Sequence, residues 1–222
     1  GGFVLLTGEV GTGKTLLCRK LLNTLDDNHY VTVFIPNSYL SPDEFRCAVA
    51  SELGIYAQEK SNHDLLQSLT ERLIEYAHRG QRVVLLVDEV QAMPDETIEA
   101  LRLLTNLETE SEKLFQVVLF GQPELDKKLD QYRLRQLKQR ITYSHSLKKL
   151  DEDEVRGHIN WRMETAGYTG MPPFDSDTCA AIAKASGGIP RLVNILSHKA
   201  LLAAFGKGDD RVSATYAYRA IA

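Results

Sequence analysis

The sequence of 222 residues predicts an α/β fold, with a three-layer domain built on a parallel sheet and an all-helical C-terminal part. Over residues 1–147, short apolar runs bounded by glycine or proline alternate with segments of helical periodicity. A glycine-rich loop separates the first apolar run from the first helical segment. From residue 148 onward only helical patterns remain. We therefore expect an α/β domain at residues 1–147 and a helical domain at residues 148–222.

The expected strands are short apolar runs, as in parallel strands that are buried on both faces. The run Val83–Val87 is the most hydrophobic of them. Ile141–Leu147 alternates only weakly between apolar and polar residues, which indicates an edge strand. The expected strands lie at residues 3–6, 31–35, 83–87, 114–120 and 141–147.

The expected helices carry apolar residues at spacings of three and four. Ser41-Pro42 is a clear helix start, because serine caps a helix and proline suits its first position. Gly54 and Gly80 indicate the ends of two helices, and Asp95 is expected to cap another. Besides the helix after Asp95, the expected helices span residues 14–25, 41–53, 64–78, 125–129, 152–166, 176–186, 190–205 and 213–222.

Composition excludes several classes of protein. A content of 43% hydrophobic and 25% charged residues excludes disordered and fibrous chains. The net charge of −4 gives no general attraction to nucleic acid or anionic lipid. The three cysteines form no CxxC pair, which favours a reducing cytosol. No stretch reaches the ~20 apolar residues that span a bilayer, and the start at Gly1-Gly2, directly on a strand, indicates a piece of a longer chain.

The loop after the first strand matches the phosphate-binding pattern G-x-x-x-x-G-K-[ST] in full. Its glycines let backbone N–H groups point at phosphate oxygens, and the helix that follows adds its positive dipole end. Lysine supplies a cation for the β- and γ-phosphates, and the final hydroxyl suits Mg²⁺. A chance glycine turn is the alternative, but a strand before and a helix after are the required context. The loop consists of Gly8, Glu9, Val10, Gly11, Thr12, Gly13, Lys14 and Thr15.

A second part of the expected site follows the strand Val83–Val87. Asp88 and Glu89 lie at the carboxyl end of this strand, where α/β sheets bind their ligands. One carboxylate, Asp88, can bind Mg²⁺ through its hydration shell, and the next, Glu89, can act as general base toward the attacking water. Taken alone, an Asp-Glu pair is more often a solvated loop or a helix cap. Downstream of a complete phosphate loop, it predicts a triphosphate hydrolysis site.

These features together resemble the AAA+ ATPases, P-loop NTPases with an αβα base and a helical lid. More narrowly, four strings of the sequence resemble the ExeA/GspA-like ATPases of type II secretion and pilus biogenesis. They are GFVLLTGEVGTGKT, VDEVQAM, LRLLTNLET and FGQPEL. The similarity runs across essentially the whole chain. It implies ATP and Mg²⁺ as ligands, an αβα base at residues 1–147 and a lid at residues 148–222.

The resemblance also implies residues that respond to the γ-phosphate. Gln122 lies at the polar sensor position after the fourth strand, where many relatives have Asn or Thr, although Gly121-Gln122-Pro123 could be only a turn. Gly187-Gly188-Ile189-Pro190-Arg191 resembles the sensor-2 signature of the lid. A cation such as Arg191 is unfavourable in the first turn of a helix, and a nearby phosphate would offset that cost.

An arginine finger, which acts on the nucleotide of a neighbouring subunit, is a further implied element. Arg140, just before the last strand, resembles this position, and Arg135 is a rival. Both can instead belong to a solvated basic surface, which would also suit contact with nucleic acid.

The resemblance implies an ATP-hydrolysing module that couples turnover to assembly or positioning of a secretin in a secretion or pilus machine. It implies a homo-oligomer, or a hetero-oligomer with secretion or pilus components of the inner membrane. The module is expected to be cytoplasmic, in a protein that continues into a membrane span and a periplasmic region.

Two alternative functions stay open. The first is a DNA-transaction AAA+ ATPase of the transposition or replication-initiator type. The acidic net charge counts against it, and nucleic acid is not expected as a partner. The second is a scaffold that binds ATP but scarcely turns it over, which the intact Glu89 counts against.

Overall fold

The computed structural model describes residues 2–57, 60–107 and 114–221. The last two residues of the string LRLLTNLET, Glu108 and Thr109, lie outside the described residues, as do Gly1 and Ala222. The chain forms two compact units. The sheet unit contains residues 1–8 and 14–146, and the helical unit contains residues 9–13 and 147–222. The division into a nucleotide-binding base at 1–147 and a lid at 148–222 stays a prediction.

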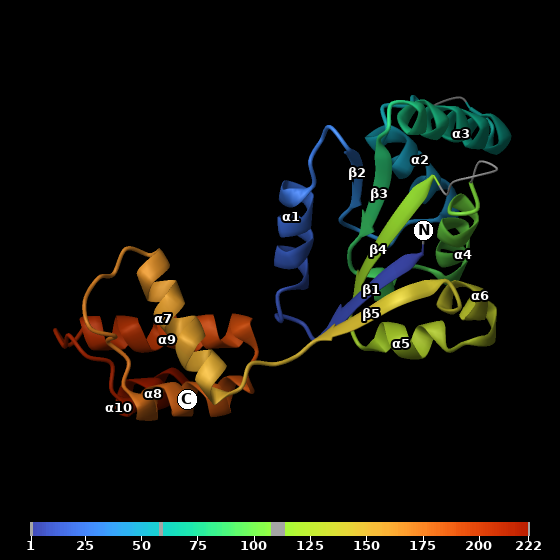
Figure 1. Cartoon of the computed structure of the whole chain (residues 1–222). Coiled ribbons are helices and arrows are strands. Elements are labelled where there is room, and N and C mark those ends of the chain that lie inside the picture. Colours follow the sequence, from blue (N-terminus) through green and yellow to red (C-terminus); the bar gives the residue numbers. More distant parts are fainter. Residues whose placement is uncertain (1, 58–59, 108–113, 222) are drawn as a thin grey trace. The chain divides into compact units, whose positions relative to one another are not determined.

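The sheet unit contains a five-stranded sheet in the order β2-β3-β4-β1-β5 (Figure 1). The pairs β2–β3, β3–β4 and β1–β4 are parallel, which confirms the predicted fold class. Thr7 of β1 is opposite Gly121 of β4, and Val87 of β3 is opposite Leu119. The carboxyl ends of these three strands therefore meet at one edge of the sheet. The strands are β1 (Phe3–Gly8), β2 (Tyr30–Ile35), β3 (Arg82–Val87), β4 (Phe115–Gly121) and β5 (Ile141–Leu147).

The helices of the sheet unit follow the predicted pattern with local differences. Helix α3 begins two residues earlier than expected, because the Ser61 side chain accepts a hydrogen bond from the Asp64 N–H and caps the helix there. The prediction that Asp95 caps α4 was wrong, since Pro94 is the cap and Asp95 is the first helical residue. The helices are α1 (Lys14–Thr24), α2 (Pro42–Glu52), α3 (Asn62–His78), α4 (Asp95–Leu104), α5 (Glu124–Leu129) and α6 (Arg135–Lys138), with 3₁₀ turns η1 (Val90–Ala92) and η2 (Tyr132–Leu134).

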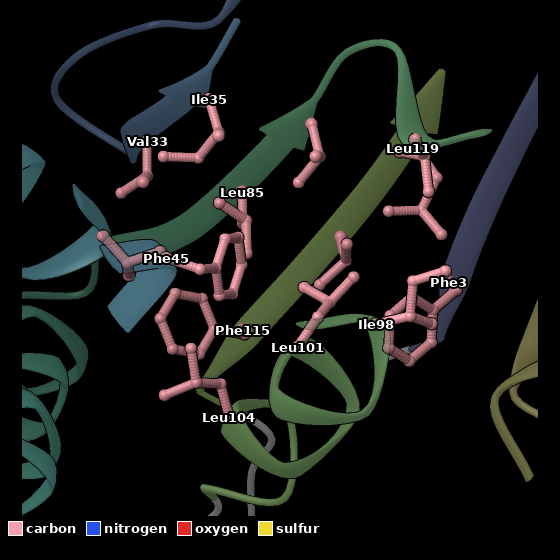
Figure 2. Close-up of a cluster of buried hydrophobic side chains, with 14 of the residues drawn as sticks. Phe3, Val33, Ile35, Phe45, Leu85, Ile98, Leu101, Leu104, Phe115 and Leu119 are labelled. Carbon is pink, nitrogen blue, oxygen red and sulfur yellow. The ribbon is translucent and has the colours of Figure 1, made fainter. Parts of the chain in front are cut away.

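The sheet is buried on both faces because its central strands β1, β3 and β4 are apolar at most positions. Alternate residues of β3 point to opposite faces, so that Leu85 joins the larger core with α2 to α4, and Leu86 joins the smaller core with α1. Figure 2 shows the larger core, where Phe45, Leu101 and Leu104 pack against side chains of the strands. Complete burial of one such side chain stabilises the fold by about 1.5–3 kcal/mol. This packing holds the carboxyl ends of the strands in place.

The helical unit contains α7 (Glu152–Thr165), α8 (Ser176–Ser186), α9 (Pro190–Phe205) and α10 (Ala214–Ile221) around a second core. Gly188, between α8 and α9, has a φ of 73°, and a Cβ there would lie 2.0 Å from the carbonyl oxygen of Leu150. The Leu150 N–H donates to the Gly188 carbonyl at 2.8 Å, so only glycine allows this close pairing. Among the helices of the described residues, none combines the length and apolar character that a bilayer crossing requires.

Candidate nucleotide site

The candidate site lies at the carboxyl edge of the sheet. Strand β1 ends at Gly8, and α1 begins at Lys14, whose ammonium donates a hydrogen bond to the Gly8 carbonyl oxygen at 2.7 Å. Asp88 and Glu89 follow the end of β3, and Gln122 follows the end of β4. Since β4 lies between β1 and β3, the sheet topology brings all three strand ends to one edge.

Thr15 and Asp88, the two predicted metal ligands, are in direct contact. The Thr15 hydroxyl donates a hydrogen bond to Oδ2 of Asp88 at 2.9 Å, although the two residues are 73 positions apart. Both groups are oxygen donors, the class that Mg²⁺ prefers. The pair therefore fits the chemistry of a magnesium site.

Lys14 is a buried cation among acidic groups. It is only 5% exposed. Burial lowers the pKa of its ammonium, and the charges of Glu89, Asp88 and Glu124 act in the opposite direction. A cation that has lost much of its water interacts more strongly with a bound anion, because the local dielectric constant is low. This environment suits Lys14 to bind phosphate.

Glu89 has an unusual backbone conformation, with φ 54° and ψ 36° in the left-handed region. Among the described residues it is the one non-glycine residue with positive φ. Such a conformation costs about 1–3 kcal/mol and persists only where surrounding contacts hold it. Here the carbonyl oxygen of Glu89 accepts hydrogen bonds from the Ser38 hydroxyl at 2.6 Å and the Ala92 N–H at 2.9 Å. Its own N–H donates to Oδ1 of Asp88 at 2.9 Å.

The carboxylate of Glu89 is hydrogen-bonded by two glutamines. Oε2 of Glu89 accepts from Nε2 of Gln122 at 3.2 Å and from Nε2 of Gln91. The backbone N–H of Gln122 donates to Oε1 of Gln91 at 3.0 Å. The structure thus brings the predicted residues Glu89 and Gln122 into direct contact. A third residue, Gln91, contacts both, although sequence reasoning assigned it no role.

Residues 9–13 of the phosphate loop are grouped with the helical unit. Within that unit, the Arg191 N–H donates to the Gly11 carbonyl oxygen at 3.2 Å, and Lys149 forms an ion pair with Glu9 at 2.7 Å. Gly11 and Gly13 have φ values of 86° and 103°, which side chains rarely tolerate. A Cβ on Gly11 would also lie 2.9 Å from Cβ of Arg191. Arg191 is in the first turn of α9, as predicted, and it is exposed.

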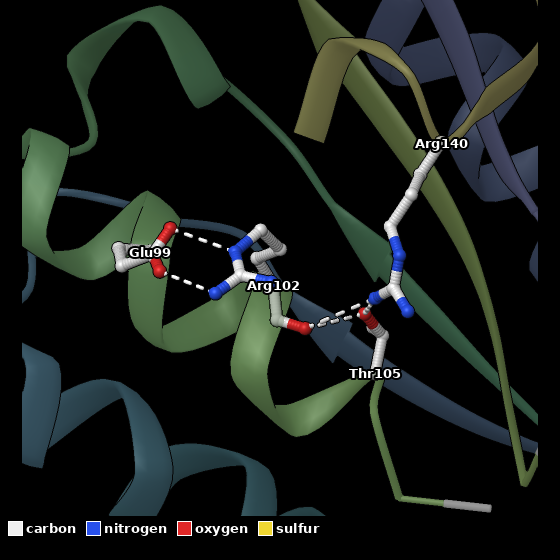
Figure 3. A network of polar contacts seen from close by, with 4 residues as sticks. All are labelled: Glu99, Arg102, Thr105 and Arg140. Atoms are coloured by element: carbon white, nitrogen blue, oxygen red, sulfur yellow. Dashed lines mark hydrogen bonds and ion pairs between the residues drawn. The ribbon is translucent and has the colours of Figure 1, made fainter. Parts of the chain in front are cut away.

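The two arginines considered for the finger have different surroundings. The guanidinium of Arg140 is half-buried and donates to Thr105 Oγ1 at 3.1 Å and to the Arg102 carbonyl oxygen at 3.4 Å, at the C-terminal end of α4 (Figure 3). Arg102 itself is bound to Glu99 through two hydrogen bonds. By contrast, Arg135 is exposed, with its guanidinium 5.3 Å from the ring centroid of Tyr132. Arg140 therefore has a structural contact inside the sheet unit, whatever its role toward a neighbour.

Sequence reasoning missed three residues around the site. Ser38 lies just after β2 and is fully buried, and Lys128 in α5 donates to the carbonyl oxygens of Met93 and Gln91. The third is Gln91. Its place two residues after Glu89, inside the string VDEVQAM, was a signal, but spacing alone does not show that its side chain turns back toward the carboxylate.

Comparison with known proteins identifies a family and relatives of this chain. Residues 1–129 match the family described as AAA domain. General secretion pathway protein A of Aeromonas hydrophila is 41% identical over 213 residues, which are 96% of this chain and 39% of that protein. The chain thus spans well under half of its curated relative.

Solved structures show the same fold at low sequence identity. The Aeropyrum pernix ORC2 protein is 14% identical and superposes with a TM-score of 0.74. The match covers 99% of this chain and 61% of the ORC2 chain. The Thermotoga maritima RuvB Holliday junction branch migration motor, at 18% identity, has a TM-score of 0.66 with the same coverages of 99% and 61%. The match over residues 1–129, more than half of the sequence, shows that the chain belongs to the AAA domain family.

Proposed function

We propose that this chain binds ATP with Mg²⁺ and hydrolyses ATP to ADP and phosphate. The observation that carries the proposal is the 2.9 Å contact between Thr15 of the phosphate loop and Asp88 of the neighbouring strand end. A buried lysine and a second carboxylate, Lys14 and Glu89, lie beside this pair. Phosphoryl transfer to water needs a phosphate-binding cation, a metal site and a base, and these side chains support the assignment of those three roles.

Each residue of the site has a proposed role. The loop Gly8–Thr15 holds the phosphates through backbone N–H groups, and Lys14 neutralises charge on the β- and γ-phosphates. Thr15 and Asp88 would hold Mg²⁺, which when bound withdraws charge from the transferred phosphoryl group. Glu89 takes a proton from the attacking water, which then bonds to the γ-phosphorus as the bond to ADP breaks. Gln122 orients that water or contacts the γ-phosphate.

A phosphate-release assay on Glu89→Gln tests the catalytic assignment. The substitution removes the base and keeps the size of the side chain, so we expect kcat to fall by about 10²–10⁴-fold. ATP affinity, measured by calorimetry, should stay within a few-fold of wild type. Lys14→Ala should instead lose ATP binding. Glu96→Gln, the same change on the exposed first turn of α4, is the matched control and should behave as wild type.

Equal phosphate release by wild type and Glu89→Gln would refute hydrolysis by this site and would leave ATP binding as the function. Absence of ATP binding by the folded wild-type protein would refute the proposal as a whole. For the metal site at Thr15 and Asp88, we expect ATP binding to be lost when EDTA removes Mg²⁺. Added Mg²⁺ should restore ATP binding.

We further propose that the module works as an oligomer, with residues 1–147 as base and residues 148–222 as lid. In this proposal Arg191 responds to the γ-phosphate, and Arg140 or its rival Arg135 acts on the nucleotide of a neighbouring subunit. Support comes from the position of Arg191 in the first turn of α9, where its charge is unfavourable without a nearby anion. Sedimentation with and without ATP tests the oligomer.

The identity of 41% to a general secretion pathway protein supports a role in secretion or pilus assembly. We propose a cytoplasmic ATPase module that couples turnover to assembly or positioning of a secretin, with inner-membrane components as partners. The test replaces the matching region of the Aeromonas hydrophila protein by this chain. We expect the chimera to support secretion and its Glu89→Gln form to fail. Salt-dependent binding of the chain to duplex DNA, with no secretion by the chimera, would instead favour a DNA-transaction ATPase.

A further inference from the structure

Three side chains at the ends of β3 and β4 form a closed set of hydrogen bonds. The amides of Gln91 and Gln122 both donate to Oε2 of Glu89. The set is closed by the backbone N–H of Gln122, which donates to Oε1 of Gln91 at 3.0 Å. Gln91 therefore joins the carboxylate after β3 to the backbone after β4, across 31 positions of sequence.

The orientation of the Gln91 amide follows from its partners. A backbone N–H can only donate, so the atom of Gln91 that faces the Gln122 N–H must be the carbonyl oxygen. The NH₂ group then faces Glu89, where the carboxylate can only accept. Both ends of the amide are thus paired with the one partner type that each can use. A side chain with two such partners has a single orientation.

The turn that carries Gln91 is itself held in place. Val90 and Met93 are fully buried, and the Lys128 ammonium from α5 donates to the carbonyl oxygens of Met93 and Gln91. Lys128 also forms an ion pair with Asp95 at 3.4 Å. Gln91 therefore extends from a fixed backbone, which is the requirement for a side chain that positions another group.

We propose that Gln91 is a positioning residue for the hydrolysis of ATP, a statement that rests on the function proposed above. It holds the Glu89 carboxylate by Oε2 and thereby directs Oε1 toward the attacking water. Because Gln91 also bonds the backbone of Gln122, the carboxylate and the sensor position at the end of β4 are held as one unit. Gln91 acts through Glu89 and does not itself take the proton.

Two substitutions of Gln91 test this role in the full chain. Gln91→Met removes donor and acceptor with little change in volume, and Gln91→Glu keeps the acceptor but removes the donor. For both we expect kcat to fall by about 10–100-fold, because a displacement of about 1 Å at a reacting group has this effect. KM and the Kd for ATP should stay within about twofold, since ground-state binding does not use Glu89. Gln81→Met, at a glutamine that bonds a distant carbonyl oxygen, is the matched control.

A double-mutant cycle distinguishes positioning from a general structural effect. In a Glu89→Ala background, Gln91→Met should cause no further loss of kcat, because the group that it positions is absent. Three results would overturn the proposal. The first is an equal loss of kcat in the wild-type and Glu89→Ala backgrounds, and the second is wild-type kcat in both Gln91 variants. The third is reduced ATP affinity together with reduced thermal stability in both Gln91 variants. If wild type and Glu89→Gln release phosphate equally, the ATPase function itself fails, and this result is separate from any result on Gln91.

Discussion

Replacing Arg140 with alanine is expected to loosen the last turn of α4. The guanidinium donates to Thr105 Oγ1 at 3.1 Å and to the Arg102 carbonyl oxygen at 3.4 Å. A hydrogen bond from a charged donor contributes about 1.5–3 kcal/mol, and a cation at a helix C-terminus about 0.3–1 kcal/mol. The second bond is long and the side chain is half-exposed, so we take about 2 kcal/mol for the whole contact.

Hydrogen exchange measures this loss at the place where it occurs. A free energy of about 2 kcal/mol corresponds to roughly 30-fold faster exchange if local opening limits the rate. The amides of Thr105 and Asn106, which bond the carbonyl oxygens of Leu101 and Leu103, are the reporters. The matched control is Arg135→Ala, which removes an exposed arginine of the neighbouring segment and should leave α4 unchanged.

Unchanged exchange at Thr105 and Asn106 in Arg140→Ala would refute the structural assignment. If that variant instead lost phosphate release with α4 intact, Arg140 would act on a nucleotide and not on its own helix. The same loss in Arg135→Ala alone would assign the finger to Arg135. Hydrogen exchange and phosphate release together therefore decide whether Arg140 or Arg135 acts as the finger, which sequence reasoning left open.

Two further predictions concern buried side chains. At about pH 8 a thiol reagent should modify exposed Cys47 quickly, and Cys18 and Cys179 only after unfolding. The reason is that burial raises the pKa of Cys18 to about 12 and also raises the pKa of Cys179. A fast-reacting thiol in the Cys47→Ser variant would contradict this prediction. Thr178→Val should lower the stability of the helical unit by about 1–3 kcal/mol, because the buried Val212 carbonyl oxygen loses its donor at 2.9 Å. Urea unfolding followed by Trp161, the single tryptophan, measures this loss, with the exposed Thr165→Val as a control expected to stay within about 0.5 kcal/mol.

The strands, most helices and the central pair of the site could be predicted from the sequence, because their signals are local. Buried parallel strands require continuous apolar runs, as in Val83–Val87, and capping residues mark helix ends. The pattern of the phosphate loop defines its own neighbours, a strand before and a helix after. Since β/α topology directs strand ends to one edge, the loop after β1 and Asp88 after β3 are expected at the same edge of the sheet.

Other features depend on contacts between distant segments, which no local pattern records. The left-handed backbone of Glu89 is held by Ser38, 51 positions away, and its carboxylate is bonded by Gln122, 33 positions away. In the sequence Arg140 is one charge of a basic run, yet its partners are Arg102 of α4 and Thr105, the C-cap of that helix. The amino-acid sequence by itself thus determined which chemical groups reach the edge of the sheet. Only the tertiary structure decided how those groups are oriented, because side-chain direction depends on the packing of segments that are far apart along the chain.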